Sequence, residues 1–403
     1  MNWKFWILST VAILLVVEMF SLLPHRFAKI SERKDRNYSI GTIHNHSVFS
    51  DGGGTVPQIA QAAHNVGFDF VVLTDHNTTE ARRAGFEKNY AGTDVFVEME
   101  ASTGHGHVLI FSSHTPSVSL TDKKLSEVAW LLVNRELELP GVFTVIAHPT
   151  NVKNSWRYLD VFPTDGIEIV NLDSIWQREL FETPIEFSLT AMLSPINNFL
   201  AALRFFQVFP PDLQWWDASN RLEHGHFGIM AHDAHSRLKL RPDLIFELPT
   251  YEMTFRLGAN VVFFDGPAAT DFEARKKQIY DSIHAGKSAV IYQLLHPFEG
   301  NDWYIEKDGK RFHSGEAIPV GGNCLSVARI PDDLNYPAVY RLLKEGAVVG
   351  EMEFSDSHEI RTPFRCDRGT YRAEIATRPR TFFRGMLHRE VPYVIYNPVY
   401  VDY

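Results

Sequence analysis

Short hydrophobic runs alternate with amphipathic segments over most of the chain. The runs are rich in Val, Ile and Phe, and most of them lead directly into a His, Asp or Glu. Strands that alternate with helices are typical of an α/β barrel or a doubly wound sheet. The strands that this pattern predicts are 39–44, 68–74, 94–100, 107–111, 142–147, 166–170, 228–231, 260–264 and 288–292.

The ends of these predicted strands are where we expect a functional site. In a parallel barrel the carboxyl ends of the strands share one face, so polar residues there meet although they are far apart in the sequence.

Two segments depart from the alternation. Residues 185–216 are apolar and aromatic. They fit either a helical insertion packed on the barrel or a helix lying at a membrane surface, and the shortage of Lys and Arg favours the insertion. Over residues 305–403 the helical pattern thins, and β-prone runs appear at 347–354, 370–375 and 391–401. These runs predict a small antiparallel sheet or sandwich that serves packing or interaction.

The amino-terminal segment has the character of a membrane anchor. Residues 5–23 are nearly all apolar and about as long as a bilayer-spanning helix, although Glu18 would cost about 2.5–3.5 kcal/mol near mid-membrane. The basic start at Lys4 also suits a secretory signal, but no small-residue cleavage site precedes Pro24. We therefore expect residues 1–24 to be a single-pass transmembrane anchor or uncleaved signal. A cleaved secretory signal is the main alternative, and a buried soluble helix is a lesser one.

The orientation of such an anchor stays open. Five basic residues follow the apolar stretch closely, whereas only Lys4 and the amino terminus precede it. By the positive-inside tendency this imbalance would keep the body of the protein in the cytoplasm. A signal anchor would instead export the body.

Composition narrows the classes of function. With 45% hydrophobic and 22% charged residues, the 403-residue chain is a folded protein with room for one large domain and a smaller one. A formal net charge of −10 gives no overall field that would attract nucleic acid. Cys324 and Cys366 are too few for a disulfide framework and lack zinc-site spacing, so we expect two inert buried thiols, or one bridge if this region is exported.

Metal-binding residue types stand at the ends of the predicted strands. His44 and His46 are two positions apart on a strand, so their imidazoles lie on the same side. The glycines after Asp51 let the backbone fold back, so that this carboxylate can join them. Further strand ends supply the other candidates, which are His76, Glu100, His105, His107, His148, His232, Asp233 and His235.

The chemistry of this set indicates catalysis. A single histidine at a strand end is usually structural, but so many candidates at the positions that a barrel gathers predict a metal centre. A carboxylate such as Glu100 can bridge two cations about 3.5–4 Å apart. Mixed imidazole and carboxylate ligands suit Zn, Mn or Fe, and the absence of cysteine argues against a closed structural zinc site.

The order and spacing of these motifs resemble the polymerase and histidinol phosphatase (PHP) family of metallohydrolases. The motifs are His44-Asn45-His46-Ser47, Ser50-Asp51-Gly52, Thr74-Asp75-His76-Asn77, Glu100 with His107, Ala147-His148-Pro149 and Asp233-Ala234-His235. The resemblance covers residues 38–300, and it implies that this part forms a distorted (β/α)7 barrel that holds two or three divalent metal ions. The ligands that it implies are His44, His46, Asp51, His76, Glu100, His107, His148, Asp233 and His235.

Within that family the chain looks most like the stand-alone branch that includes carbaryl-type hydrolases. The His-Asn-His-Ser start, the Thr-Asp-His-Asn motif and a β tail ending in Tyr396-Asn397-Pro398-Val399-Tyr400 carry this likeness. The sequence departs from the family pattern in two places: His105 and His107 could exchange roles, and His232 stands where the family usually has Ser or Gly.

The resemblance and the ligand chemistry together predict a metal-dependent hydrolase. A phosphoesterase is favoured, in which metal ions activate a water that attacks a small phosphate ester. A carbamate, ester or amide hydrolase with the same cluster is the nearest alternative, and a noncatalytic membrane-bound protein with a degenerate barrel is the alternative of another class. Asp75, His105 and His232 are candidates to shuttle a proton or to orient a ligand, the latter being favoured for Asp75. The candidates to clamp a phosphate, or else to lie solvated, are Arg237, Lys239 and Arg241.

Overall fold

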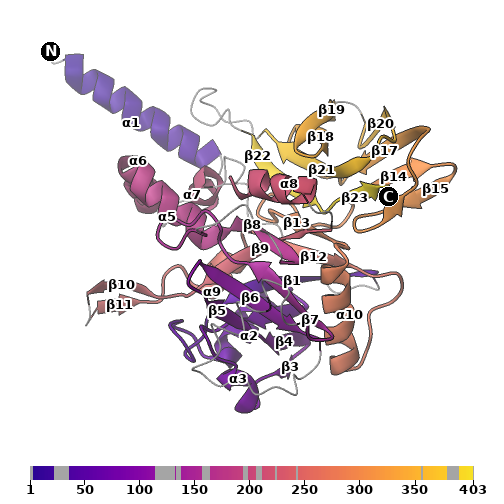
Figure 1. The fold of residues 1–403 in the computed structure, drawn as a ribbon. Helices are drawn as coiled ribbons and strands as arrows, with labels where there is room; N and C mark the ends of the chain where they lie inside the picture. The colour runs from indigo at the N-terminus through magenta and orange to yellow at the C-terminus, as the bar shows by residue number, and fades with distance from the viewer. Residues whose placement is uncertain are drawn as a thin grey trace.

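The computed structural model describes residues 3–21, 36–113, 132, 138–156, 164–193, 198–205, 211–222, 225–241, 244–354, 357–378 and 390–402 (Figure 1). Its central feature is a sheet that closes into a barrel. The strands of the ring are, in spatial order, β4 (Thr93–Val97), β2 (Phe70–Leu73), β1 (Tyr38–Asn45), β9 (Phe227–Ala234), β8 (Gly166–Asn171), β7 (Val142–Ile146), β6 (His107–Ser112) and β5 (Met99–Ser102). Pairing is parallel from β4 through to β7.

The ring closes because β4 and β5 follow each other directly along the chain, with only Glu98 between them. Strand β6 is antiparallel to both β5 and β7, and a bridge between His76 and Glu100 joins the end of β2 to β5. The α/β barrel expected from the sequence is therefore confirmed, and the doubly wound alternative is excluded. The strand predicted over 94–100 is interrupted at Glu98, whose carboxylate accepts hydrogen bonds from the Ser112 amide and the Tyr280 hydroxyl.

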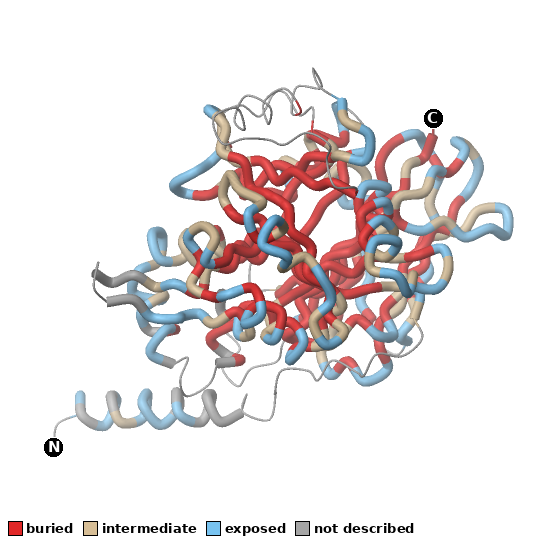
Figure 2. Tube along the Cα trace, turned by 90° about the horizontal axis from the view of Figure 1, so that it is seen from below, coloured by how far each residue is buried: buried red, intermediate tan, exposed pale blue. Residues whose placement is uncertain are grey.

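The interior of the barrel is apolar, and helices cover its outside. Strand β2 reads Phe-Val-Val-Leu and all four residues are buried, as expected for a strand of a parallel sheet that is covered on both faces. Figure 2 shows that buried residues concentrate in the barrel and the sheet next to it. The surrounding elements are α2 (Val56–Asn65), α3 (Glu80–Arg83), β3 (Lys88–Tyr90), β10 (Leu238–Arg241), β11 (Leu244–Phe246), α9 (Tyr251–Phe255) and α10 (Phe272–His284).

The apolar segment 185–216 belongs to a helical insertion that packs on the barrel. Phe199, Leu203 and Trp216 are buried, and the Trp216 indole donates a hydrogen bond of 2.8 Å to the carbonyl oxygen of His226. This agrees with the favoured expectation of a packed insertion. The helices are α5 (Leu172–Glu182), α6 (Pro184–Leu193), α7 (Asn198–Phe205) and α8 (Asp212–Leu222).

The carboxy-terminal part is mostly antiparallel β structure, as predicted, but it continues the barrel sheet. Pairing runs outward from β1 through β12 (Ala259–Phe263) and β13 (Ser288–Ile291) to β22 (Val391–Tyr396). The remaining strands of this sheet are β21 (Gly369–Thr377), β18 (Ala338–Lys344), β19 (Ala347–Phe354), β23 (Val399–Val401) and β16 (Ala317–Ile318). A second sheet has the order β15 (Lys310–Phe312), β14 (Asp302–Lys307), β17 (Asn323–Arg329) and β20 (Glu359–Arg365).

Cys324 and Cys366 form a disulfide, with their Cα atoms 5.6 Å apart. The bond links β17 to the residue that follows β20, and both cysteines are buried. The expectation of two separate inert thiols is therefore wrong, and the alternative of a single bridge holds. The two positions meet because β17 and β20 are antiparallel neighbours.

An amino-terminal helix, α1 (Trp3–Ser21), forms where the apolar stretch was found. Figure 1 shows it standing away from the barrel. Trp3, Trp6 and Ile13 are exposed on it, so the alternative of a buried soluble helix is not supported. Among the residues that the structure describes, no helix combines the length and the apolar character that a membrane crossing requires.

Candidate metal centre

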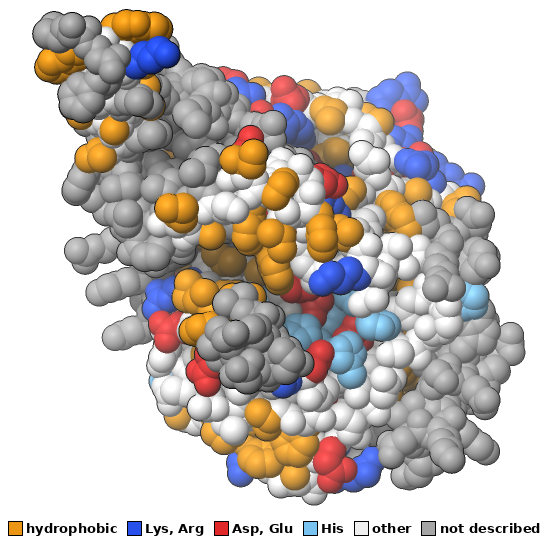
Figure 3. All heavy atoms as spheres, turned by 90° about the vertical axis from the view of Figure 1, so that its left-hand side faces the viewer, with side chains coloured by type: hydrophobic (Ala, Val, Ile, Leu, Met, Phe, Trp, Pro, Cys, Tyr) orange, Lys and Arg blue, Asp and Glu red, His pale blue; other side chains and the backbone are white. Residues whose placement is uncertain are grey.

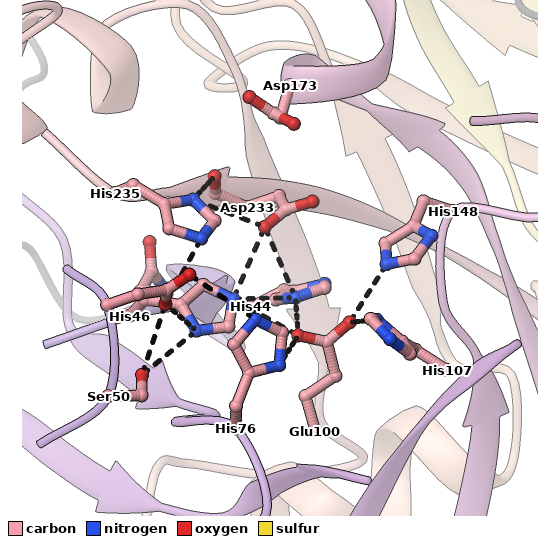
Figure 4. A network of polar contacts seen from close by, with 12 residues as sticks. His44, His46, Ser50, His76, Glu100, His107, His148, Asp173, Asp233 and His235 are labelled. Carbon is pink, nitrogen blue, oxygen red and sulfur yellow. Dashed lines mark hydrogen bonds and ion pairs between the residues drawn. The ribbon is translucent and has the colours of Figure 1, made fainter. Parts of the chain in front are cut away.

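Nine side chains from the ends of the barrel strands gather at one place, most of them labelled in Figure 4. His44 lies at the end of β1, His76 follows β2, and His148 follows β7. Asp233 lies near the end of β9, with His235 directly after that strand. The gathered residues are the nine that the sequence motifs imply: His44, His46, Asp51, His76, Glu100, His107, His148, Asp233 and His235.

Glu100 lies at the centre, with imidazole nitrogens around both of its carboxylate oxygens. Its Oε1 accepts hydrogen bonds from His107 Nδ1 at 2.7 Å and from His148 Nε2 at 2.8 Å. Its Oε2 lies 3.0–3.2 Å from one ring nitrogen of each of His76, His44 and His46. The residue is only 1% exposed, so these contacts form away from solvent.

Two further carboxylates approach the same imidazoles from other sides. Asp233 Oδ1 lies 3.4 Å from His44 Nε2 and 3.3 Å from His46 Nε2. Asp51 Oδ1 lies 3.4 Å from His235 Nε2 and 3.6 Å from His46 Nδ1. These positions define three groups whose ligand atoms lie within 4.8 Å of one another: His44, His46 and Asp233; His46, Asp51, His76 and His235; and His76, Glu100 and His107.

The backbone at three of these residues is left-handed. The φ angle is 63° at His44, 30° at His148 and 49° at Asp233. Residues other than glycine rarely adopt such angles, which cost of the order of 1–3 kcal/mol each. Strain of this kind collects at functional sites, where the surrounding contacts fix the direction of a side chain.

The loop after β1 brings Asp51 to the histidines. A Cβ atom on Gly52 would lie 2.2 Å from the carbonyl oxygen of His46, so the close approach of the two segments requires glycine. Asp75 holds the loop from the other side, because its carboxylate accepts hydrogen bonds from the amide (2.8 Å) and the hydroxyl (2.7 Å) of Ser47. The fold-back predicted from the glycines is confirmed, and Asp75 lies where it can orient the loop.

Glu168 belongs to the centre although the sequence did not reveal it. Its Oε1 lies 2.6 Å from His44 Nδ1, and its Oε2 accepts a hydrogen bond of 2.6 Å from the backbone amide of His148. By accepting a hydrogen bond from Nδ1, Glu168 can keep the ring proton of His44 on that atom and leave Nε2 available to a cation. Carboxylates commonly support metal-binding histidines in this way. The available signal was a lone carboxylate in the predicted strand 166–170, whose other residues are apolar.

Carboxylates surround the buried imidazole of His44, and imidazoles surround the buried carboxylate of Glu100. Burial lowers the pKa of His44, but the charges of Asp233, Glu168 and Glu100 outweigh it and hold that pKa well above its usual value. Burial raises the pKa of Glu100, but the charge of His44 and hydrogen bonds from the neighbouring imidazoles hold it well below its usual value.

Two outer histidines behave in the same way. Although burial opposes it, the hydrogen bond and charge of Glu100 raise the pKa of His148 to about 9. Likewise, the hydrogen bond of Asp51 and the charge of Asp233 outweigh burial and raise the pKa of His235 to about 10. Without a metal, both imidazoles are therefore in the doubly protonated, positively charged form at neutral pH.

The donor set fits divalent cations. Among the residues that the structure describes, Glu100 Oε2 and His76 Nδ1 are buried atoms that make no hydrogen bond, although they are only 3.0 Å apart. A buried polar atom without a partner costs about 1–3 kcal/mol, and a cation between such atoms removes that cost. Imidazoles and carboxylates without a thiolate are ligands that suit Zn, Mn or Fe.

Of the candidate proton shuttles, His232 is turned away from this centre. His232 is next to Asp233 on β9 and therefore faces the other side of the strand, where its ring nitrogens lie 2.9 Å from Thr42 Oγ1 and 2.9 Å from Gly258 O. Burial lowers the pKa of His232 to about 4, so it is neutral at physiological pH. His105 lies in the turn between β5 and β6, outside the three groups of ligand atoms found in the described residues.

Of the three basic residues expected to clamp a phosphate, Arg237 is placed at the rim. It is exposed, and its Nη1 donates a hydrogen bond of 3.2 Å to the carbonyl oxygen of Asp51. Lys239 and Arg241 lie on β10, which pairs with β11 in a hairpin that projects from the body (Figure 1). Their side chains lie outside the part of the chain that the structure describes.

The centre opens to solvent on one side. Figure 3 shows histidine and acidic side chains in a hollow that hydrophobic side chains border. The side chain of Asp51 is 51% exposed and that of His76 28%, whereas His44 and Glu100 are buried beneath them. A small substrate can therefore reach the outer ligands.

Comparisons with known proteins give distant structural likenesses among solved structures. No family model and no curated protein matches the chain. A two-domain protein from Bacteroides vulgatus, described as containing a predicted PHP-like metal-dependent phosphoesterase, is 16% identical, with 92% of this chain and 99% of that chain covered and a TM-score of 0.40. A candidate metal-dependent phosphoesterase from Bifidobacterium adolescentis is 15% identical, with 51% and 90% covered and a TM-score of 0.30. Likenesses at this level leave the function to be inferred from the side chains of the metal centre.

Proposed function

We propose that this protein is a metal-dependent hydrolase of the PHP type and, more narrowly, a phosphoesterase. The observation that carries the proposal is Glu100, a buried carboxylate with imidazole nitrogens within 3.2 Å around both oxygens. A carboxylate in that position suits a bridge between two cations. The opening beside Asp51 and His76 supplies the access that a purely structural metal site does not need.

Two or three divalent ions, Zn, Mn or Fe, would be held by the nine gathered residues. When bound, such ions lower the pKa of a water molecule and polarise the phosphoryl oxygen of the substrate. Glu168 keeps His44 and His148 in place, and Asp75 keeps the loop of Asp51 in place. These supporting contacts do the positioning that hydrolysis at a metal centre requires.

A carbamate, ester or amide hydrolase would use the same centre. Arg237 favours an anionic substrate, because it places a positive charge at the rim beside Asp51. A panel of substrates decides between the two chemistries.

The test uses full-length protein purified without chelator, with Mn or Zn added, against aryl phosphates and aryl carboxylic esters. We expect turnover of the phosphates that a chelator abolishes and that added metal restores. His44→Ala and Asp233→Ala should both reduce the rate to background, whereas His313→Ala, an exposed histidine near β15, should not. Turnover of the carboxylic esters alone would contradict the phosphoesterase proposal, and full activity of His44→Ala would contradict a catalytic metal centre.

A further inference from the structure

The helix α5 begins beside the metal centre and is tied to it. Its N-cap residue, Asn171, ends β8 and accepts a hydrogen bond of 2.8 Å from the Ser174 amide. The side-chain amide of Asn171 also donates hydrogen bonds to Asp233 at 3.2 Å and to Glu168 at 2.9 Å. The first turn of α5 therefore has a fixed position relative to two carboxylates of the centre.

Asp173 lies in this first turn and projects into the space beside Asp233 and His235 (Figure 4). Its Oδ1 accepts a hydrogen bond of 2.8 Å from the Trp176 indole, and its Oδ2 accepts one from the Gln177 side chain. Both donors belong to the same helix, so they hold the carboxyl group in one orientation. The nine gathered ligands are not among these hydrogen-bond partners in the described residues.

This arrangement separates Asp173 from the other acidic groups near the centre. Asp51, Glu100 and Asp233 contact imidazoles, and Asp75 is occupied by the loop after β1. Burial, with the charge of Asp233 adding to it, raises the pKa of Asp173 to about 6. A carboxyl group in that range can hold and release a proton near neutral pH.

We propose that Asp173 is the general acid that protonates the leaving group, a role that rests on the proposed phosphoesterase function. The oxygen of a water molecule forms a bond to phosphorus. The bond from phosphorus to the leaving oxygen breaks, with its electron pair going to that oxygen, and the Asp173 carboxyl transfers its proton there. The proton lost by the attacking water restores the carboxyl group for the next cycle.

The test compares leaving groups in the Asp173→Asn variant of the full-length, metal-loaded protein. Phenyl phosphate releases a basic phenoxide that needs a proton, whereas 2,4-dinitrophenyl phosphate releases an anion that does not. We expect kcat with phenyl phosphate to fall by about 100-fold or more, and kcat with 2,4-dinitrophenyl phosphate to fall by less than about threefold. The fall of the wild-type rate on phenyl phosphate at high pH should also disappear in the variant.

A matched control is available in Asp212. It too lies in the first turn of an insertion helix, α8, burial raises its pKa to about 6, and it accepts a hydrogen bond of 3.2 Å from the Thr150 amide. Asp212→Asn should leave the ratio of the two rates unchanged. Metal content, measured by elemental analysis, should equal the wild-type value in both variants.

The outcomes separate this proposal from the proposed function. Equal losses on both phosphates, or loss of bound metal in Asp173→Asn, would overturn the role of Asp173 while leaving the phosphoesterase standing. If the wild type cleaves aryl acetates but no aryl phosphate, the phosphoesterase proposal fails, and phenyl and 2,4-dinitrophenyl acetate then test Asp173 by the same comparison. If the wild type cleaves none of these substrates, both proposals fail.

Discussion

The carboxylate of Glu168 supports the metal centre from behind. It is fully buried and contacts both the His44 ring and the His148 backbone. Because both histidines have left-handed backbone angles, their direction depends on contacts of this kind rather than on the preference of the chain. Glu168 is therefore the place where a change that touches no ligand atom should still alter metal binding.

We predict that Glu168→Gln weakens metal binding about 10–100-fold. Glutamine keeps the size of the side chain but loses the charge that holds the proton on His44 Nδ1. Competition with a chelating dye measures the affinity. Glu351→Gln, an exposed carboxylate paired with Arg341 on the distant sheet, is the control and should bind metal as the wild type does. An unchanged affinity in Glu168→Gln would show that the pair with His44 does not act on the metal.

The raised pKa values of His148 (about 9) and His235 (about 10) predict a pH dependence. Both exceed the ordinary value of 6.5, so they stabilise the metal-free fold fully below about pH 6.5, and that stability is lost as pH rises through 9 and 10. Metal must displace these protons, so its affinity rises over the same range. We expect the difference in Tm between metal-loaded and chelated protein to widen from pH 6.5 to 9. A constant difference would contradict this linkage.

At the residue scale, the nine ligands could be identified from the sequence because each belongs to a motif at a predicted strand end. Glu168 and Asp173 could not be identified from the sequence, each for its own reason. Glu168 carries no motif of its own, and its role follows only from the pairing of β8 with β7 and β9. Asp173 depends on the direction in which α5 leaves β8, which hydrophobic periodicity does not specify.

Between elements, a buried ion cluster joins the insertion to the carboxy-terminal sheet. Arg372 on β21 makes two hydrogen bonds, of 2.7 and 2.8 Å, to the carboxylate of Asp217 on α8, and it also contacts Glu374. The Arg372 side chain is only 4% exposed. Since α8 lies at the end of the insertion that begins with α5, this cluster fixes the far end of the segment that carries Asp173.

We predict that Arg372→Met destabilises the protein by about 3–5 kcal/mol, because it leaves two buried carboxylates without a cation. Urea unfolding measures the change. Arg378→Met removes an exposed arginine that pairs with Glu353 and Glu390, and it should cost less than about 1 kcal/mol. Equal effects of the two substitutions would mean that the buried cluster contributes no more to stability than an exposed ion pair does.

Strands with a regular hydrophobic pattern could be predicted from the sequence, whereas the strands with which they pair were harder to predict. The predicted strands 142–147 and 288–292 appear as β7 and β13 within one residue at each end. The pairing of β13 with β22 was not predicted, because a strand about 100 positions later in the chain covers that edge. Local hydrophobic alternation identifies a strand but leaves its distant neighbour unspecified.

For the whole molecule, the Cys324–Cys366 disulfide bears on where the protein works. Disulfides persist in oxidising compartments and are rare in the cytosol. The bridge closes a loop of 42 residues in the carboxy-terminal region. On this ground we propose that the body of the protein is exported, which is one of the two orientations that the charges around residues 5–23 left open.

We predict that removing this bridge lowers the free energy of unfolding by about 4 kcal/mol, from the loop entropy that the bond removes from the unfolded chain. Chemical unfolding with and without reductant measures the loss. The control is the variant with both Cys324→Ser and Cys366→Ser, which should be as unstable as the reduced wild type and insensitive to reductant. A wild type that reductant leaves unchanged would show that the cysteines are not joined.

The spread of the ligands along the chain has a consequence for biogenesis. They extend from His44 to His235, and these two regions become neighbours only when β9 pairs with β1. A nascent chain that stops before β9 therefore lacks the last ligands, and a chain that has not closed its ring holds the ligands too far apart to capture ions together. Ion uptake by the proposed metal centre would therefore follow ring closure, so only molecules with a closed barrel would become active hydrolases.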